Sequence, residues 1–125
     1  MNIRQGFLVL TAVGLFPIAL SYGLAPHKIL EYLYGFSVQS VNEAHIFRAI
    51  MGLYLALILF WLIGAYKSHL RQAALYSLVV FMLGLAAGRL ISLVLDGVPH
   101  WLLLFYFFAE VVSGVLGLRL LKRAD

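Results

Sequence analysis

The chain has 125 residues, of which 64% are hydrophobic and only 11% are charged, and its mean hydropathy is +1.01. A soluble domain carries about 25% charged residues, so this composition excludes a soluble protein and indicates one integral membrane domain. The absence of cysteine excludes disulfides and thiolate metal sites. The formal charge of +4 does not indicate nucleic-acid binding, because the basic residues gather on one side of the predicted membrane topology.

Four long apolar segments predict an all-α fold, an integral membrane four-helix bundle that occupies residues 1–125 as a single domain. A membrane span needs about 20 helical residues, and lipid cannot satisfy a free backbone, so each segment is expected to be a helix. Short links at residues 67–71 and 96–100 predict that successive helices are antiparallel neighbours. The predicted spans are residues 7–25, 44–66, 72–95 and 101–118.

The segment between the first two spans is too long for a simple turn. It carries Leu30, Leu33 and Tyr34 at helical spacing, and Pro26 suits the first position of a helix. We therefore expect a short interfacial helix in this first outer loop. It could cover the outer mouth of the bundle or rest as an amphipathic segment at the lipid headgroups.

The basic residues predict the orientation of the spans. Only Lys28 falls in the outer loops, whereas six basic residues fall at the termini and in the middle loop. Cytoplasmic loops carry the excess of Lys and Arg, so both termini are expected to be cytoplasmic, in a bacterial cytoplasmic membrane. These six residues are Arg4, Lys67, Arg71, Arg119, Lys122 and Arg123.

Three ionisable residues, Arg48, Arg89 and Glu110, interrupt the spans. A charge at bilayer depth costs roughly 3 kcal/mol on insertion scales, so such residues usually have a partner and a function. Helical rise places both arginines in the outer half and Glu110 nearer the middle, and an antiparallel arrangement lets Arg89 or Arg48 reach Glu110. We expect the three charges to form one constellation.

Polar residues on the same helix faces predict an outward-opening cavity among the second, third and fourth spans. Two arginines face one glutamate there, so one cation requires Asp96, Glu43 or the phosphate or carboxylate of a ligand. A structural alternative is that the charges only hold the helices together, with Gly84 and Gly88 as a small-residue packing face. The predicted ligand-binding residues are Asn42, His45, Arg48, Arg89, Ser92, Asp96 and Glu110.

Metal or haem binding is not expected. Histidine and acidic residues do occur near the predicted outer face, but they lack the close repeat that zinc ligands show. No cofactor is predicted. The residues considered are His27, Glu43, His45, Asp96 and His100.

Sequence motifs around these charges resemble a known family. The motifs are Asn42-Glu43-Ala44-His45-Ile46-Phe47-Arg48, Gly88-Arg89-Leu90-Ile91-Ser92, Asp96-Gly97-Val98-Pro99 and, in the fourth span, Glu110. They are similar to a bacterial family of small four-helix membrane proteins catalogued only as a domain of unknown function, more distantly DoxX-like. The resemblance covers nearly the whole chain and implies the four-helix fold without implying a reaction. Among the residues of these motifs, the resemblance points to Arg48, Arg89, Asp96 and Glu110 as candidate functional residues.

Three functions follow from these features. The first is an accessory subunit, or a binder of an anionic lipid or amphiphile, which acts alone, as a homo-oligomer or beside a larger membrane complex. The second is a membrane enzyme, such as an isomerase, with Glu110 as general acid or base; no other catalytic residue is assigned. The third is a small dimeric transporter coupled to protons through Glu110. The bilayer is the expected environment of all three.

Overall fold

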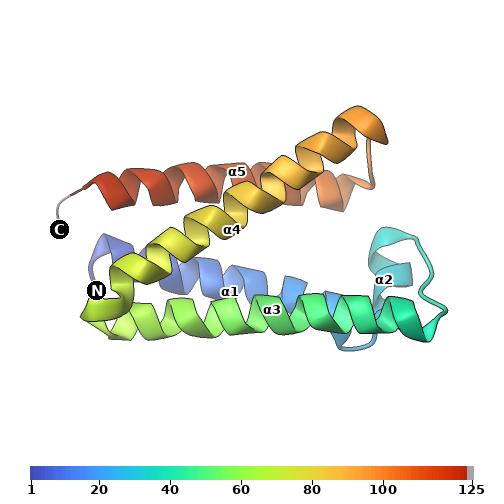
Figure 1. The fold of residues 1–125 in the computed structure, drawn as a ribbon, viewed down its shortest axis with the longest axis horizontal. Helices are drawn as coiled ribbons and strands as arrows, with labels where there is room; N and C mark the ends of the chain where they lie inside the picture. The colour runs from blue at the N-terminus through green and yellow to red at the C-terminus, as the bar shows by residue number, and fades with distance from the viewer. Residues whose placement is uncertain (124–125) are drawn as a thin grey trace.

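The structure, a computed structural model, describes residues 1–123, and helices are the only regular secondary structure in this range (Figure 1). The expected all-α fold is therefore confirmed. Four of the helices are long and apolar enough to cross a membrane, as expected of a multi-pass membrane protein. The helices are α1 (Ile3–Gly23), α2 (Pro26–Tyr34), α3 (Val41–Tyr66), α4 (Ser68–Leu95) and α5 (Trp101–Lys122).

Two long helices begin earlier than the predicted spans because side chains cap their first turns. The Asn2 side chain accepts a hydrogen bond from the backbone of Gln5 at 2.9 Å, and the Gln5 side chain accepts one from the Asn2 backbone in return. Ser40 and Glu43 form the same reciprocal box at the start of α3, with 3.0 Å between Glu43 N and Ser40 Oγ. Such a box satisfies amide groups that a helix start leaves free, so each helix gains about one turn.

The connection between α3 and α4 is a single residue, Lys67, rather than the predicted link of residues 67–71. Arg71, in the first turn of α4, donates hydrogen bonds to the last carbonyls of α3, at 3.2 Å to Gly64 and 2.9 Å to Ala65. The final carbonyls of a helix have no partner within the helix, so this side chain satisfies groups that would otherwise need water. A turn this tight can therefore lie close to the bilayer.

The predicted helix in the first long loop is α2. It begins at Pro26, whose fixed φ suits a first helical position, and it ends at Gly35, which has φ of 78°. Leu30 and Tyr34 are buried, with 0% and 6% of their surface exposed. Helix α2 therefore packs into the end of the bundle, and its contact with headgroups stays a prediction.

The long helices are arranged as two packed pairs joined through α3 and α4. Helix α1 lies along α3, and α4 lies against α5 (Figure 1). Helix α4 crosses the bundle diagonally, so its far end diverges from α3. We call this end, where α2 contacts α1, α3 and α5, the α2 end, and the opposite end, which carries the termini, the terminal end.

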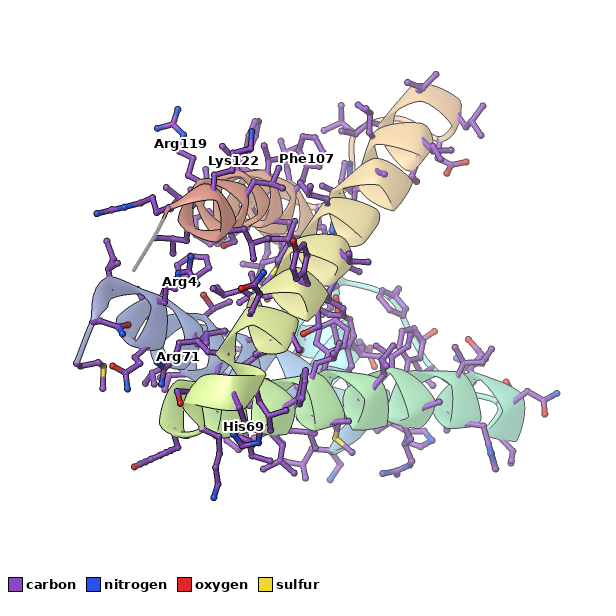
Figure 2. All side chains as sticks on the ribbon, turned by 60° about the vertical axis from the view of Figure 1, so that its left-hand side comes forward. Arg4, His69, Arg71, Phe107, Arg119 and Lys122 are labelled. Atoms are coloured by element: carbon purple, nitrogen blue, oxygen red, sulfur yellow. The ribbon has the colours of Figure 1, made fainter. Side chains whose placement is uncertain are left out.

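Basic side chains gather at the terminal end. Figure 2 shows Arg4 on α1, Arg71 on α4, and Arg119 and Lys122 on α5 at this end of the molecule. Arg4 also donates a hydrogen bond from Nη2 to the carbonyl oxygen of Arg123, which ties the start of α1 to the end of α5. The clustering of charge that was predicted along the sequence is thus present in space.

Trp61 lies in the interior of the bundle, although it is close to the end of α3. Its side chain is fully buried, and its indole Nε1 donates a hydrogen bond to Ser77 Oγ of α4 at 3.0 Å. Phe81 packs edge-on against the same indole, with 5.8 Å between the ring centroids. Trp61 therefore joins α3 to α4 instead of marking the membrane boundary.

Close helix contacts depend on small residues at defined positions. A Cβ added at Gly64 of α3 would collide with Ala74 of α4, and one added at Gly117 of α5 would lie 2.6 Å from Val79 Cγ2. A Cβ at Gly52 of α3, in contrast, would have nothing within 4 Å. Small residues let membrane helices approach closely, so Gly64 sets the spacing of α3 from α4 and Gly117 that of α5 from α4.

Replacing Gly64 with leucine should destabilise the bundle, because the new side chain must displace α4. Overpacking of this kind typically costs about 1–3 kcal/mol. Thermal unfolding in detergent, followed by circular dichroism, should show a lower midpoint for Gly64→Leu. Gly52→Leu is the matched control and should melt as the unaltered protein does; equal melting of the two variants would contradict the close contact.

Candidate functional site

An ion pair lies inside the bundle between α4 and α5. Arg89 Nε donates a hydrogen bond to Glu110 Oε1 at 2.8 Å, and the two side chains are 22% and 9% exposed. The expectation that an arginine of the second or third span reaches Glu110 is confirmed for Arg89. Pairing a charge in a membrane bundle lowers the cost of its burial, so each residue accounts for the presence of the other.

Small residues on α5 bring the two partners together. Gly114 lies one turn after Glu110 on the same helix face, and a Cβ at this position would collide with the side chain of Leu83 on α4. The Leu83 side chain of α4 therefore packs directly on the α5 backbone one turn from the carboxylate. This packing holds α4 and α5 together beside the ion pair.

Hydroxyl groups lie beside the ion pair. The sequence did not predict this cluster of hydroxyls. The hydroxyls of Tyr34 in α2 and Tyr106 in α5 are 3.0 Å apart and hydrogen-bonded, and Ser21 Oγ of α1 lies 3.2 Å from the Tyr34 hydroxyl. The guanidinium carbon of Arg89 lies 5.8 Å from the centre of the Tyr106 ring, a cation–π distance. This hydroxyl chain links α1, α2 and α5 beside the ion pair.

Two further tyrosines complete the cluster. The rings of Tyr22 and Tyr54 meet edge to face with 5.5 Å between their centroids, and the rings of Tyr22 and Tyr34 are stacked with 6.1 Å between their centroids. Only 9% of the Tyr22 surface is exposed, so this residue lies inside the bundle. The position of Tyr106 in this cluster could have been predicted from the sequence, because Tyr106 precedes Glu110 by four residues and so shares its helix face.

A cavity of about 500 Å³, which we call the α3–α4 cavity, opens beside Arg89 where α4 diverges from α3. Its volume is within the range of about 300–1,000 Å³ that is typical of ligand pockets. Gly84 and Gly88 line it, and a Cβ at either would have nothing within 4 Å, so they are not a packing face within this chain. The lining residues are Tyr22, Ile50, Leu53, Tyr54, Phe81, Gly84, Leu85, Gly88, Arg89, Ser92, Leu93, Gly97, Pro99, Leu103, Leu104 and Phe107.

Arg48 does not join Arg89 and Glu110, so the expectation of one three-charge constellation is wrong. Its Nη1 donates a hydrogen bond to the Gly23 carbonyl at the end of α1, at 2.8 Å, because α3 packs along α1. With Arg48 elsewhere, the charges at the ion pair balance one to one. The predicted excess cation is absent from this site.

Arg48 instead borders a separate surface hollow of about 600 Å³ near the α2 end. His45, a second predicted ligand-binding residue, is exposed in the same hollow. Arg48 and His45 thus lie together, apart from the α3–α4 cavity. The hollow is lined by His27, Gln39, Val41, Ala44, His45, Arg48 and Ala49.

The remaining predicted residues lie at the exposed ends of helices. Ser92 lines the α3–α4 cavity and donates a hydrogen bond from Oγ to Asp96 Oδ2 at 2.7 Å. Asn42 is exposed in the first turn of α3 and lines neither opening. Within residues 1–123, no group of three acidic or histidine side chains lies close enough to hold a metal ion.

Comparison with protein families matches residues 3–121 to a family described as a domain of unknown function, DUF4345. The chain belongs to this family. The resemblance to a family of unknown function is therefore confirmed, whereas the DoxX-like relationship and the bacterial origin stay predictions. No curated protein matches the chain. No solved structure matches it.

The DUF4345 match includes both members of the ion pair and all of the four long helices except Lys122.

Replacing Arg89 with leucine should leave the Glu110 carboxylate buried without its partner. Breaking a buried pair in this way costs about 3–5 kcal/mol, so denaturant unfolding in micelles should show a large loss of stability. The double variant Arg89→Leu with Glu110→Leu should recover much of that loss, because neither charge then remains buried.

Arg48→Leu is the control for this prediction. It removes an exposed arginine whose described hydrogen bond goes to one backbone carbonyl, so the expected loss is about 1 kcal/mol. Similar losses for Arg89→Leu and Arg48→Leu, or no recovery in the double variant, would show that the ion pair does not stabilise the bundle.

Proposed function

We propose that this chain is a multi-pass membrane protein that binds an amphiphile in the α3–α4 cavity, with the ligand's head group at Arg89. The observation that supports this proposal is that a partly exposed arginine lines an otherwise largely apolar cavity. A head group that accepts hydrogen bonds matches a guanidinium, and an apolar tail matches the remaining lining. Phosphates, carboxylates and carbonyl head groups share this acceptor chemistry.

The arginine retains donors for such a head group. Its described hydrogen bond to Glu110 uses Nε, so the two terminal nitrogens are not engaged by the carboxylate. A planar guanidinium presents these nitrogens as a fork that fits two oxygens of one phosphate or carboxylate. The Tyr22 hydroxyl and Ser92 lie on the same cavity wall and can add to the polar contacts.

The sequence predicted an anionic ligand because it indicated an excess cation, but the charges of the ion pair balance. Glu110 offsets the charge of Arg89, so a head group gains mainly from hydrogen bonding and less from net attraction. Anionic and uncharged acceptors are therefore both suited to the cavity. The two can be separated with matched probes, hexadecyl phosphate for the anionic head and methyl hexadecanoate for the uncharged one.

The tail of the ligand would leave the cavity between α3 and α4. These helices diverge toward the α2 end (Figure 1), and Gly84 and Gly88 add no side chains to the α4 surface that lines the cavity. Neighbouring outward positions are apolar and exposed, such as Leu53 at 57% and Val80 at 70%. A hydrocarbon chain can thus run from Arg89 into the surrounding lipid without meeting a polar surface.

The proposed orientation puts the terminal end in the cytoplasm. The support is the gathering of Arg4, Arg71, Arg119 and Lys122 at that end (Figure 2), because cytoplasmic ends of membrane proteins are enriched in basic residues. Arg89 then lies in the outer half of the membrane, which we propose is a bacterial cytoplasmic membrane. An accessory role beside a larger membrane complex or in a homo-oligomer is compatible with the same ligand site.

Binding requires only groups that the structure describes. The isomerase and the proton-coupled transporter both require, in addition, that Glu110 exchanges a proton during each cycle. Arg89 holds one carboxylate oxygen at 2.8 Å, so such exchange would have to overcome a formed ion pair. We therefore place amphiphile binding ahead of both alternatives.

Gly88→Leu should weaken ligand binding without unfolding the protein. A side chain at this position enters the open space of the α3–α4 cavity and meets no atom within 4 Å of its Cβ. Titration of hexadecyl phosphate and methyl hexadecanoate, followed by native mass spectrometry, should show binding weakened at least about tenfold, or about 1.4 kcal/mol.

Gly52→Leu provides the control for this experiment. It adds the same side chain to a long helix, again with free space around the Cβ, but at a position that does not line the cavity. Its affinity for both probes should equal that of the unaltered protein. If neither probe binds, or if Gly88→Leu binds them as Gly52→Leu does, the α3–α4 cavity is not the binding site.

A further inference from the structure

A second opening lies on the other side of the ion pair, between the first and last long helices. Helices α1 and α5 are not packed closely on each other, although each has a close neighbour in α3 or α4. The opening, which we call the α1–α5 groove, has a volume of about 380 Å³ and is mostly apolar. Leu10 and Gly14 of α1 and Ser113 and Leu116 of α5 line it, together with Glu110.

Glu110 offers this groove an oxygen that the ion pair does not use. Arg89 donates a hydrogen bond to Oε1, whereas no described residue donates one to Oε2. The Oε2 atom is also not among the fully buried atoms that lack a partner, so part of its surface is open. The side chain is 9% exposed, so the carboxylate is otherwise covered by the bundle. An ionised carboxylate only accepts hydrogen bonds, and Oε2 is thus an acceptor without a donor at the wall of an apolar groove.

We propose that the α1–α5 groove binds an uncharged long-chain alcohol, whose hydroxyl group donates a hydrogen bond to Glu110 Oε2. A donor is required because the open group is an acceptor. A neutral head is favoured because Arg89 already balances the carboxylate: an ammonium head would lie close to the guanidinium, and an anionic head would face Glu110. The hydrocarbon chain would lie along Leu10, Gly14 and Leu116.

A second polar group in the groove fits the same head. Thr11 lines the groove, and its hydroxyl donates its own hydrogen to the Phe7 carbonyl at 2.8 Å. The remaining lone pairs of this oxygen are therefore acceptors too. Both Thr11 and Glu110 thus present acceptors to the groove, which favours a ligand that brings a hydrogen.

This site is independent of the proposed function. Arg89 presents donors to the α3–α4 cavity, whereas Glu110 presents an acceptor to the α1–α5 groove. The two openings take head groups of opposite hydrogen-bonding character, and a variant that fills one leaves the other open. Failure of either proposal can therefore be recognised separately.

The test uses the full chain in detergent micelles with a photoreactive hexadecanol that carries a diazirine in its alkyl chain. Peptide mapping by mass spectrometry should place the adducts on α1 and α5. Gly14→Leu should reduce labelling at least about fivefold, because a Cβ at Gly14 has nothing within 4 Å and the longer side chain fills the groove. Gly88→Leu, which fills the other opening, should leave labelling unchanged.

A second comparison needs no variant, so it holds even if Gly14→Leu fails to fold. The methyl ether of the same probe has an equal chain but lacks the hydroxyl donor, and it should label the groove at least about fivefold less. Equal labelling by alcohol and ether would overturn the proposal, as would labelling that Gly14→Leu leaves intact in a folded protein. Crosslinks between α1 of one copy and α5 of another, without alcohol adducts, would show that a second copy covers the groove, which also overturns it.

Discussion

The hydrogen bond between Arg89 and Glu110 is the interaction on which the arrangement of this bundle depends. Removing a charged group from water costs several kcal/mol even after the protein relaxes, so neither residue is stable at this depth without the other. Their contact ties α4 to α5 at a fixed register. The same contact holds the guanidinium beside the Tyr106 ring, and Tyr106 bonds Tyr34 of α2. The position of α2 is thus connected to the ion pair.

The ion pair also forms a partition between two openings. Arg89 lies on the wall of the α3–α4 cavity and Glu110 on the wall of the α1–α5 groove, with the Tyr54 side chain bordering both. A buried pair usually satisfies itself and faces no ligand. Here the hydrogen bond uses only Arg89 Nε and Glu110 Oε1, which leaves the two terminal nitrogens and Oε2 outside it. Each residue can therefore line an opening while it remains paired with the other.

The parts of the fold that depend on local chemistry could be predicted from the sequence. Apolar length fixed the four long helices, and Pro26 marked the start of α2. Helical rise and antiparallel neighbours predicted that Arg89 or Arg48 would reach Glu110, but not which of the two. The early starts of α1 and α3 were not predicted, although Asn2 with Gln5 and Ser40 with Glu43 have the spacing of a capping box.

The parts of the fold that depend on which helix packs against which could not be predicted from the sequence. Arg48 and Arg89 have similar depth and surroundings in the sequence, but α3 packs along α1, so Arg48 meets the Gly23 carbonyl instead of an acid. Tyr22 near a helix end has the same sequence appearance whether it anchors at the interface or points inward. Its burial against Tyr54 follows from tertiary packing that hydropathy does not report.

Because a single residue joins α3 to α4, the angle between these two helices is set at the terminal end. Its 28 residues make a rod of about 42 Å that is fixed at the terminal end by Lys67 and Arg71 and diverges from α3 at the other end. A rotation of about 5° at this base would move the far end of the rod by about 4 Å. The width of the α3–α4 cavity therefore depends on the angle that α4 takes at the terminal end, where the basic residues lie.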